Sequence, residues 1–170
     1  MRLGGSGTSD DPRIAEYQNP RDILEILRGA RTVAVVGLSP DELRASNFVG
    51  FYLQRHGYRV VPVNPRTGDI LGEQSYPSVA DIPFPVDVVD VFRRPEAVPA
   101  IAEEAVAAGA RALWLQFGVI SFDGAEIGGR AGLRVVMDRC LKVEHARYMG
   151  RMHWLGFNTW QVTARRAWSV

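Results

Sequence analysis

The chain has 170 residues, 46% of them hydrophobic and 23% charged, as in one ordinary globular domain, and two large domains would not fit. Its 20 basic and 19 acidic residues leave a net charge of +1, which gives no electrostatic basis for binding nucleic acid or a membrane surface. A single cysteine excludes an internal disulfide framework and fits a reducing compartment. No apolar run approaches the roughly 20 residues of a membrane-spanning helix. We therefore expect one soluble, cytoplasmic domain.

The two ends of the chain differ in composition from its middle. Residues 1–10 contain three glycines and no apolar run, which predicts a flexible leader rather than a signal peptide. Residues 11–140 are expected to form the folded domain. Residues 141–170 carry five basic residues and are too aromatic for a disordered tail, so we expect this extension to pack on the domain or on a partner. Its aromatic residues include Trp154, Phe157, Trp160 and Trp168.

Helices and strands alternate from residue 19 onward. Asn19 and Pro20 have the residue types favoured at the start of a helix, and Gly29 is typical of a helix end. Residues 31–37 then form a continuous β-branched run without polar alternation, which indicates a strand covered on both faces. This strand is expected to be central in a parallel sheet.

The rest of the chain continues this alternation. Ser46 is expected to cap the second helix. Pro62 has no N–H to donate, so it predicts a strand end or a locally unpaired position. Strands alternating with helices require right-handed crossovers. We predict an α/β fold with a doubly wound, mostly parallel, five-stranded Rossmann-like sheet and helices on both faces. The expected strands span 31–37, 58–63, 86–92, 111–117 and 133–137, and the expected helices span 20–29, 46–55, 95–108 and 123–131.

Ligands of open parallel sheets bind beyond the carboxyl ends of the strands, where the strand order reverses. The first loop in this position suits a phosphate. Gly37 and Ser39 lead to a helix start near Asn47, where unpaired N–H groups and the helix dipole favour an anion. The spacing matches neither G-x-G-x-x-G nor a Walker loop. Gly37 therefore either helps to bind a phosphate or merely makes a tight turn.

The second loop lacks the acid of an NAD-binding fold, which lies about 20 residues after the glycines. The strand ends instead in Asn64, Pro65 and Arg66. An arginine here favours a phosphorylated ligand, such as NADP with its 2′-phosphate or coenzyme A with its 3′-phosphate. The alternative is that Arg66 is a solvated loop cation.

The third and fourth loops offer aromatic, cationic and amide groups. Phe92 and Arg93, just before the helix opened by Pro95, could stack on adenine and bind a phosphate, unless Phe92 is core and the arginine solvated. Gln116 could orient a polar ligand group or simply cap its loop. Asp90, inside the third strand, is interpreted as a structural hydrogen-bonding residue.

Cys140 follows the fifth strand on the expected ligand side of the sheet. It is either a buried core thiol or a reactive one, with Arg139 expected to lower its pKa and Asp138 to raise it. The chain shows no convincing catalytic set and no metal-ligand spacing. Whether the protein is an enzyme stays open, and the sequence favours a non-catalytic role.

Five segments in the same order resemble the standalone CoA-binding domain family, which is related to the CoA-binding domain of the succinyl-CoA synthetase alpha subunit. They cover about two-thirds of the chain, which makes the resemblance specific. The segments are VAVVGLSP (33–40), GYRVVPVNPRTGDILG (57–72), VDVVDVFRRPE (86–96), LWLQFGV (113–119) and GLRVVMDRCLKVEH (132–145).

The resemblance implies a Rossmann-type domain that binds coenzyme A without the catalytic histidine or grasp domain of the ligase. It assigns the pyrophosphate to Gly37, Ser39 and the helix start at Asn47. It assigns the nucleotide and its 3′-phosphate to the loop of Asn64, Pro65 and Arg66, and the adenine and upper pantetheine to Phe92, Arg93 and Pro95. Gln116 and Cys140 lie where the pantetheine arm of the family's ligand ends.

Three hypotheses follow. The first is a non-catalytic protein that binds CoA or acyl-CoA at the carboxyl ends of the strands, with a redox-dependent disulfide between the ligand and Cys140. The second is an NADP-binding redox sensor or reductase, and the third is a regulatory subunit of a CoA ligase. The expected partner is a small-molecule ligand, with neither nucleic acid nor membrane, and a homodimer is an open alternative.

Overall fold

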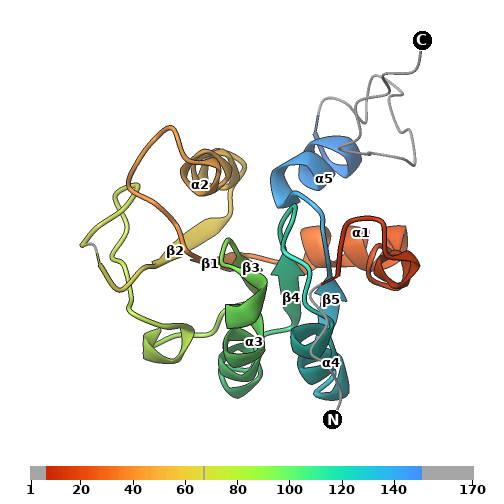
Figure 1. The fold of residues 1–170 in the computed structure, drawn as a ribbon. Helices are drawn as coiled ribbons and strands as arrows, with labels where there is room; N and C mark the ends of the chain where they lie inside the picture. The colour runs from red at the N-terminus through yellow and green to blue at the C-terminus, as the bar shows by residue number, and fades with distance from the viewer. Residues whose placement is uncertain (1–6, 67, 151–170) are drawn as a thin grey trace.

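The computed structural model describes residues 7–66 and 68–150 and contains one five-stranded sheet (Figure 1). The strand order is β2-β1-β3-β4-β5, and every neighbouring pair is parallel. This confirms the predicted doubly wound α/β fold. The strands are β1 (Thr32–Val36), β2 (Arg59–Val63), β3 (Val88–Val91), β4 (Ala112–Leu115) and β5 (Arg134–Val136). The helices are α1 (Pro20–Gly29), α2 (Ala45–Arg55), α3 (Val98–Ala107), α4 (Phe122–Arg130) and α5 (Leu141–Tyr148).

Helices cover both faces of the sheet, α3 and α4 on one and α1, α2 and α5 on the other (Figure 1). Successive side chains of a strand point to opposite faces, so β1 contributes side chains to the hydrophobic clusters on both faces of the sheet. Ala34 packs in the cluster with α3 and α4, whereas Val33 and Val35 pack in the cluster with α1 and α2. Burial on both faces explains why this strand is apolar throughout.

The first helix begins where the sequence predicts. The Asn19 side chain accepts a 2.9 Å hydrogen bond from the N–H of Arg21, and Pro20 occupies the first helical position. The buried residues Ile23 and Leu27 are four apart and therefore share the face that meets the sheet.

The start of α2 differs from the prediction. Arg44 precedes the helix and makes no side-chain cap bond, so the assignment of Ser46 as the cap is wrong. The Ser46 hydroxyl instead accepts a 3.1 Å hydrogen bond from the N–H of Ser39. The physical reason is that the loop after β1 folds back over the helix start and supplies a donor to this buried hydroxyl.

Pro62 lies inside β2, so of the two predicted alternatives it is the locally unpaired position and not the strand end. Its carbonyl oxygen accepts a 2.9 Å hydrogen bond from the N–H of Tyr76, outside the sheet, while Val63 accepts one from Gly37 on the β1 side. The N–H and C=O of one strand residue point the same way, so the nitrogen of Pro62 faces the outer side of this edge strand. Its missing donor therefore costs no ladder hydrogen bond.

The first part of the extension is a helix that packs on the domain. α5 contacts both α1 and α2, and Leu141 is buried in the same cluster. Residues 151–170, with the four aromatic residues named above, and residues 1–6 of the leader lie outside the described residues. Among the residues that the structure describes, no helix is long and apolar enough to cross a membrane.

Candidate functional site

The reversal of strand order falls between β1 and β3. The chain leaves β1 for α2 on one face of the sheet and leaves β3 for α3 on the other, although the two strands are neighbours. The loops that follow these strands therefore diverge and bound a crevice at their carboxyl ends. The structure thus brings the first and third predicted loops together.

Gly37 makes the contact between these two loops. Its φ is +89°, and a Cβ atom at this position would lie 2.7 Å from the carbonyl oxygen of Phe92 and 3.0 Å from Cδ of Arg93. A residue with a side chain would suffer both backbone strain and a clash. The absence of a side chain at Gly37 thus permits both the tight turn and the close approach of the two loops.

Three side chains fix the loop of residues 37–39. Besides Ser46, the Asn47 side chain donates a 2.8 Å hydrogen bond to the carbonyl oxygen of Ser39. The Asn64 side chain donates a 2.9 Å hydrogen bond to the carbonyl oxygen of Leu38. These bonds hold the loop against the start of α2, where the first helical N–H groups have no partner within the helix. The sequence motifs nominated Asn47 and Asn64 as ligand residues but did not reveal this anchoring role.

The cationic candidates lie on the solvent side. Arg66 is exposed, and its N–H donates a 3.0 Å hydrogen bond to Oδ1 of Asn64, while Pro65 is also exposed. Arg93 is exposed beside Gly37. These positions leave both guanidinium groups accessible to an anion near the crevice.

The third loop continues into a short helix. Phe92 is half-buried and packs against the cluster beneath α1 and α2. Pro95 begins a 3-10 helix, Pro95–Ala97, which leads directly into α3. The single predicted helix at 95–108 is therefore two segments, because the α-helix proper begins only at Val98, with a second proline, Pro99, in its first turn.

Gln116 and Asp90 form a buried pair at the carboxyl ends of β4 and β3. Nε2 of Gln116 donates a 2.8 Å hydrogen bond to Oδ1 of Asp90, which confirms that Asp90 is a hydrogen-bonding residue. Burial raises the pKa of Asp90 to about 8, and the hydrogen bond from Gln116 and an interaction with the backbone of Val91 offset only part of this effect. Oδ2 of Asp90 has no hydrogen-bond partner among the described residues.

The fourth and fifth loops are tied together by Asp138. Its Oδ1 accepts a 2.8 Å hydrogen bond from the N–H of Gly118, and its own φ is +55°. The indole of Trp114 also donates a 2.7 Å hydrogen bond to the carbonyl oxygen of Arg139. These bonds position Cys140, which immediately precedes α5.

Cys140 is a half-buried thiol, and its pKa is raised rather than lowered. Burial is the main cause, and the charge of Asp90 adds to it. The expectation that Arg139 would lower this pKa is therefore wrong. The Arg139 side chain donates a 2.7 Å hydrogen bond to Oε1 of Gln18. The charge of Asp90 raises the pKa of the thiol, an effect that the sequence analysis expected from Asp138.

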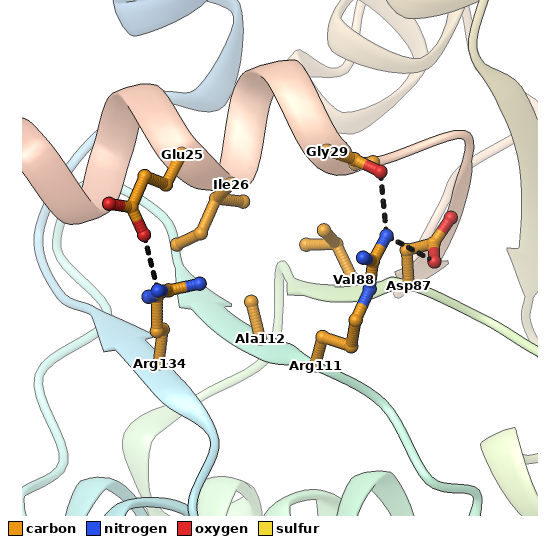
Figure 2. Close-up of a pocket in the computed structure, with 9 residues that line it drawn as sticks. Glu25, Ile26, Gly29, Asp87, Val88, Arg111, Ala112 and Arg134 are labelled. Atoms are coloured by element: carbon orange, nitrogen blue, oxygen red, sulfur yellow. Dashed lines mark hydrogen bonds and ion pairs between the residues drawn. The ribbon is translucent and has the colours of Figure 1, made fainter.

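A small cavity of about 40 Å³ lies at the amino ends of the strands, away from the crevice, between α1 and the starts of β4 and β5 (Figure 2). Ion pairs line it: Arg111 binds Asp87 at 2.7 Å, and Arg134 binds Glu25. The pair of Arg134 with Glu25 and a 2.6 Å hydrogen bond from Arg111 to the carbonyl oxygen of Gly29 fasten α1 to the sheet. The cavity lies at the amino ends of the strands, so it is not the candidate site. No group of three or more potential metal-ligating His, Cys, Asp or Glu side chains occurs in the part of the chain that the structure describes.

The parallel sheet and its β1/β3 switch point define a doubly wound α/β domain of the class that binds ligands beyond the carboxyl ends of its strands. A family model described as CoA binding domain matches residues 31–146, and the chain belongs to this family. The resemblance inferred from the five sequence segments is thereby confirmed.

The similar proteins include short chains, which the match covers almost entirely, and a ligase of which it covers one-fifth. The uncharacterized protein YneT of Bacillus subtilis is 40% identical over 131 residues, which cover 76% of this chain and 97% of YneT. The solved structure of a hypothetical protein from Pyrococcus horikoshii OT3 has a TM-score of 0.75 and 40% identity, covering 78% of this chain and 93% of that chain. The ADP-forming acetate–CoA ligase I of Archaeoglobus fulgidus is 30% identical over 128 residues, or 69% of this chain and 19% of the ligase.

Proposed function

We propose that the protein is a non-catalytic, cytoplasmic protein that binds coenzyme A or acyl-CoA. The ligand would lie in the crevice at the carboxyl ends of β1 and β3. The observation that carries this proposal is the contact of Gly37 with Phe92 and Arg93 at the switch point, beside the start of α2. Membership of the CoA-binding domain family supports coenzyme A as the ligand, and the geometry of the switch point supports this crevice as its binding site.

The phosphates are assigned to two sides of the crevice. The pyrophosphate would lie against Gly37 and Ser39 at the start of α2, near Asn47, because a helix N-terminus stabilises an anion and a glycine lets it approach. The 3′-phosphate would lie in the loop of Asn64, Pro65 and Arg66. The exposed guanidinium of Arg66 suits a phosphate that stays close to solvent.

The rest of the ligand follows β3 and then crosses toward β5. The adenine and upper pantetheine would pack on Phe92, Arg93 and Pro95, where an aromatic ring is half-exposed. The arm would end near Gln116 and Cys140. The Cys140 thiolate attacking CoA disulfide would form a protein–CoA mixed disulfide, break the S–S bond of CoA disulfide and release one CoA thiolate. The raised pKa of Cys140 predicts that this exchange is slow at neutral pH.

Two other functions have some support. An NADP-binding redox sensor or reductase is favoured by the end of β2, where Asn64 stands instead of a ribose-binding acid. A regulatory subunit of a CoA ligase is favoured by the similarity to one-fifth of an acetate–CoA ligase.

Calorimetry with CoA and with NADPH tests the proposal on the full chain. We expect saturable binding of CoA and weaker or no binding of NADPH, and a roughly tenfold or greater loss of CoA affinity in Arg66→Ala. Arg28→Ala, an exposed arginine at the end of α1, is the matched control and should bind CoA normally. Absence of CoA binding, or tighter binding of NADPH, would contradict the proposal.

A further inference from the structure

Asp90 is a fully buried carboxyl beside the switch point. In register it stands between Val35 on β1 and Trp114 on β4, and both of these residues belong to the cluster beneath α1 and α2. Cys140 packs against the same cluster and is close enough for the charge of Asp90 to act on its thiol. Asp90 thus faces the layer in which the proposed pantetheine arm ends.

One oxygen of this carboxyl lacks a partner. Oδ1 accepts the 2.8 Å hydrogen bond from Gln116, whereas Oδ2 is buried with no hydrogen-bond partner among the described residues. A buried polar atom without a hydrogen bond costs more free energy than a typical hydrogen bond contributes. Asp90 therefore has an unused hydrogen-bonding position on the ligand side of the sheet.

The protonation state of Asp90 decides what this oxygen can bind. With a pKa of about 8, Asp90 is mostly neutral at pH 7 and carries one proton. Because Oδ1 already accepts from the amide of Gln116, the proton belongs on Oδ2. Oδ2 is then a donor without charge, which suits an uncharged acceptor such as a carbonyl oxygen.

The side chains around Asp90 favour a small acyl group over a long one. Leu38, Trp114 and Leu141 fill this layer and are buried, whereas Phe92 and Cys140 are its partly exposed members at the carboxyl ends of β3 and β5. An arm that enters beside Phe92 and Cys140 would bring its sulfur end toward Asp90. A long acyl chain would have to displace buried side chains.

We propose that Oδ2 of Asp90 donates a hydrogen bond to the carbonyl oxygen of an acyl thioester, so that the protein binds short acyl-CoA in preference to ligands without that carbonyl. This inference rests on the proposed function. It names Asp90 as a specificity-determining residue and the Gln116 amide as the group that orients it.

Calorimetry with acetyl-CoA and S-ethyl-CoA tests this directly, because the thioether has nearly the same size but lacks the carbonyl. At pH 7 we expect the wild-type chain to bind acetyl-CoA about threefold to tenfold more tightly, the value of one hydrogen bond. At pH 9 Asp90 is ionised and can no longer donate, so the preference should disappear. Equal binding of the two ligands at pH 7 would overturn the inference.

Two substitutions separate hydrogen bonding from packing. Asp90→Asn keeps a donor that does not titrate, so it should keep the acetyl preference at both pH values. Asp90→Leu removes the donor and should bind both ligands equally. Should Asp90→Leu fail to fold, the pH comparison between wild type and Asp90→Asn still decides the matter. A preference that persists in wild type at pH 9 would contradict the role of Asp90.

The two proposals fail in different ways. If the wild-type chain binds neither acetyl-CoA nor S-ethyl-CoA nor CoA, the proposed function itself is wrong. If it binds all three with the same affinity, CoA binding stands and only the role of Asp90 falls.

Discussion

The hydroxyl of Tyr52 on α2 lies 3.0 Å from Nδ1 of His145 on α5. The ring of His56 stacks on Tyr52 with its centroid 4.0 Å away, and Tyr58 meets His145 edge-on at 5.5 Å. This aromatic cluster joins the helix that starts at the candidate site to the helix that follows Cys140. It makes the position of α5 dependent on an uncharged His145.

Acidification should therefore weaken the fold. Burial, assisted by the neighbouring His56, lowers the pKa of His145 from 6.5 to about 4. Between these pH values the unfolded chain binds a proton that the folded chain does not, so stability falls as the pH decreases from 6.5 to 4. The slope from this group is at most about 1.4 kcal/mol per pH unit. Urea unfolding at pH 7, 6 and 5 measures it, and His145→Gln should show a flatter dependence than wild type.

The pH dependence due to Asp90 has the opposite sign. Its pKa is raised from 3.8 to about 8, so between these values the folded chain holds a proton that the unfolded chain has lost. Stability from this group is present below pH 3.8 and decreases as the pH rises to 8. Asp90→Asn removes this loss, so its stability relative to wild type should increase between pH 5 and pH 8. Urea unfolding at both pH values would refute the idea if the difference stayed constant.

Alanine substitutions at Gly37 and Gly57 should separate the stability cost of the contact between the loops from the cost of backbone strain. Gly37 and Gly57 have almost the same φ, +89° and +87°, but a Cβ atom at Gly57 would meet nothing within 4 Å. Gly57→Ala should cost about 1–2 kcal/mol from its left-handed backbone alone. Gly37→Ala should cost about 1–3 kcal/mol more because it presses on Phe92, and it should also weaken CoA binding. Equal unfolding free energies for the two variants would show that the loops do not constrain each other.

The Asn47 side chain should matter for binding through the loop that it holds. Asn47→Ala leaves the carbonyl oxygen of Ser39 without its donor and should cost about 1–2 kcal/mol of stability together with a measurable loss of CoA affinity. Arg111→Ala is the control, because it breaks the pair with Asp87 at the far edge of the sheet (Figure 2). This exposed pair is worth up to about 1 kcal/mol, and its loss should leave CoA affinity unchanged.

The sequence predicted the order of elements well because the apolar runs carry a strong local signal. β1 reads as buried on both faces, and Asn19 with Pro20 marks the start of α1. Predicted strand ends were generally one or two residues too long, as at β3, where Asp87 lies just before the strand. Asp87 accepts hydrogen bonds from the N–H groups of Arg31 and Thr32, which a local pattern cannot reveal.

The sequence could nominate the loops of the candidate site but not the contacts within them. The rule that places ligands at the carboxyl ends of strands depends only on topology, and the structure brings two of the loops that it nominated together at the switch point. The individual partners are long-range: Asn64 reaches Leu38, and Gln116 reaches Asp90, in both cases 26 residues away. The pKa of Cys140 differs from the prediction for the same reason, since burial and the distant Asp90 raise it, and neither can be seen from its sequence neighbours.

The pairing of β1 with β3 is the only seam that joins the β2-β1 part of the sheet to the β3-β4-β5 part among the described strands. A ligand at the switch point would contact Gly37 on one side of this seam and Phe92 on the other. It would therefore act as a clamp across the sheet, and opening along the seam would first require release of the ligand. Amide hydrogen exchange should then slow in β1 and β3 together when the crevice is filled, although these strands are more than 50 residues apart in the chain.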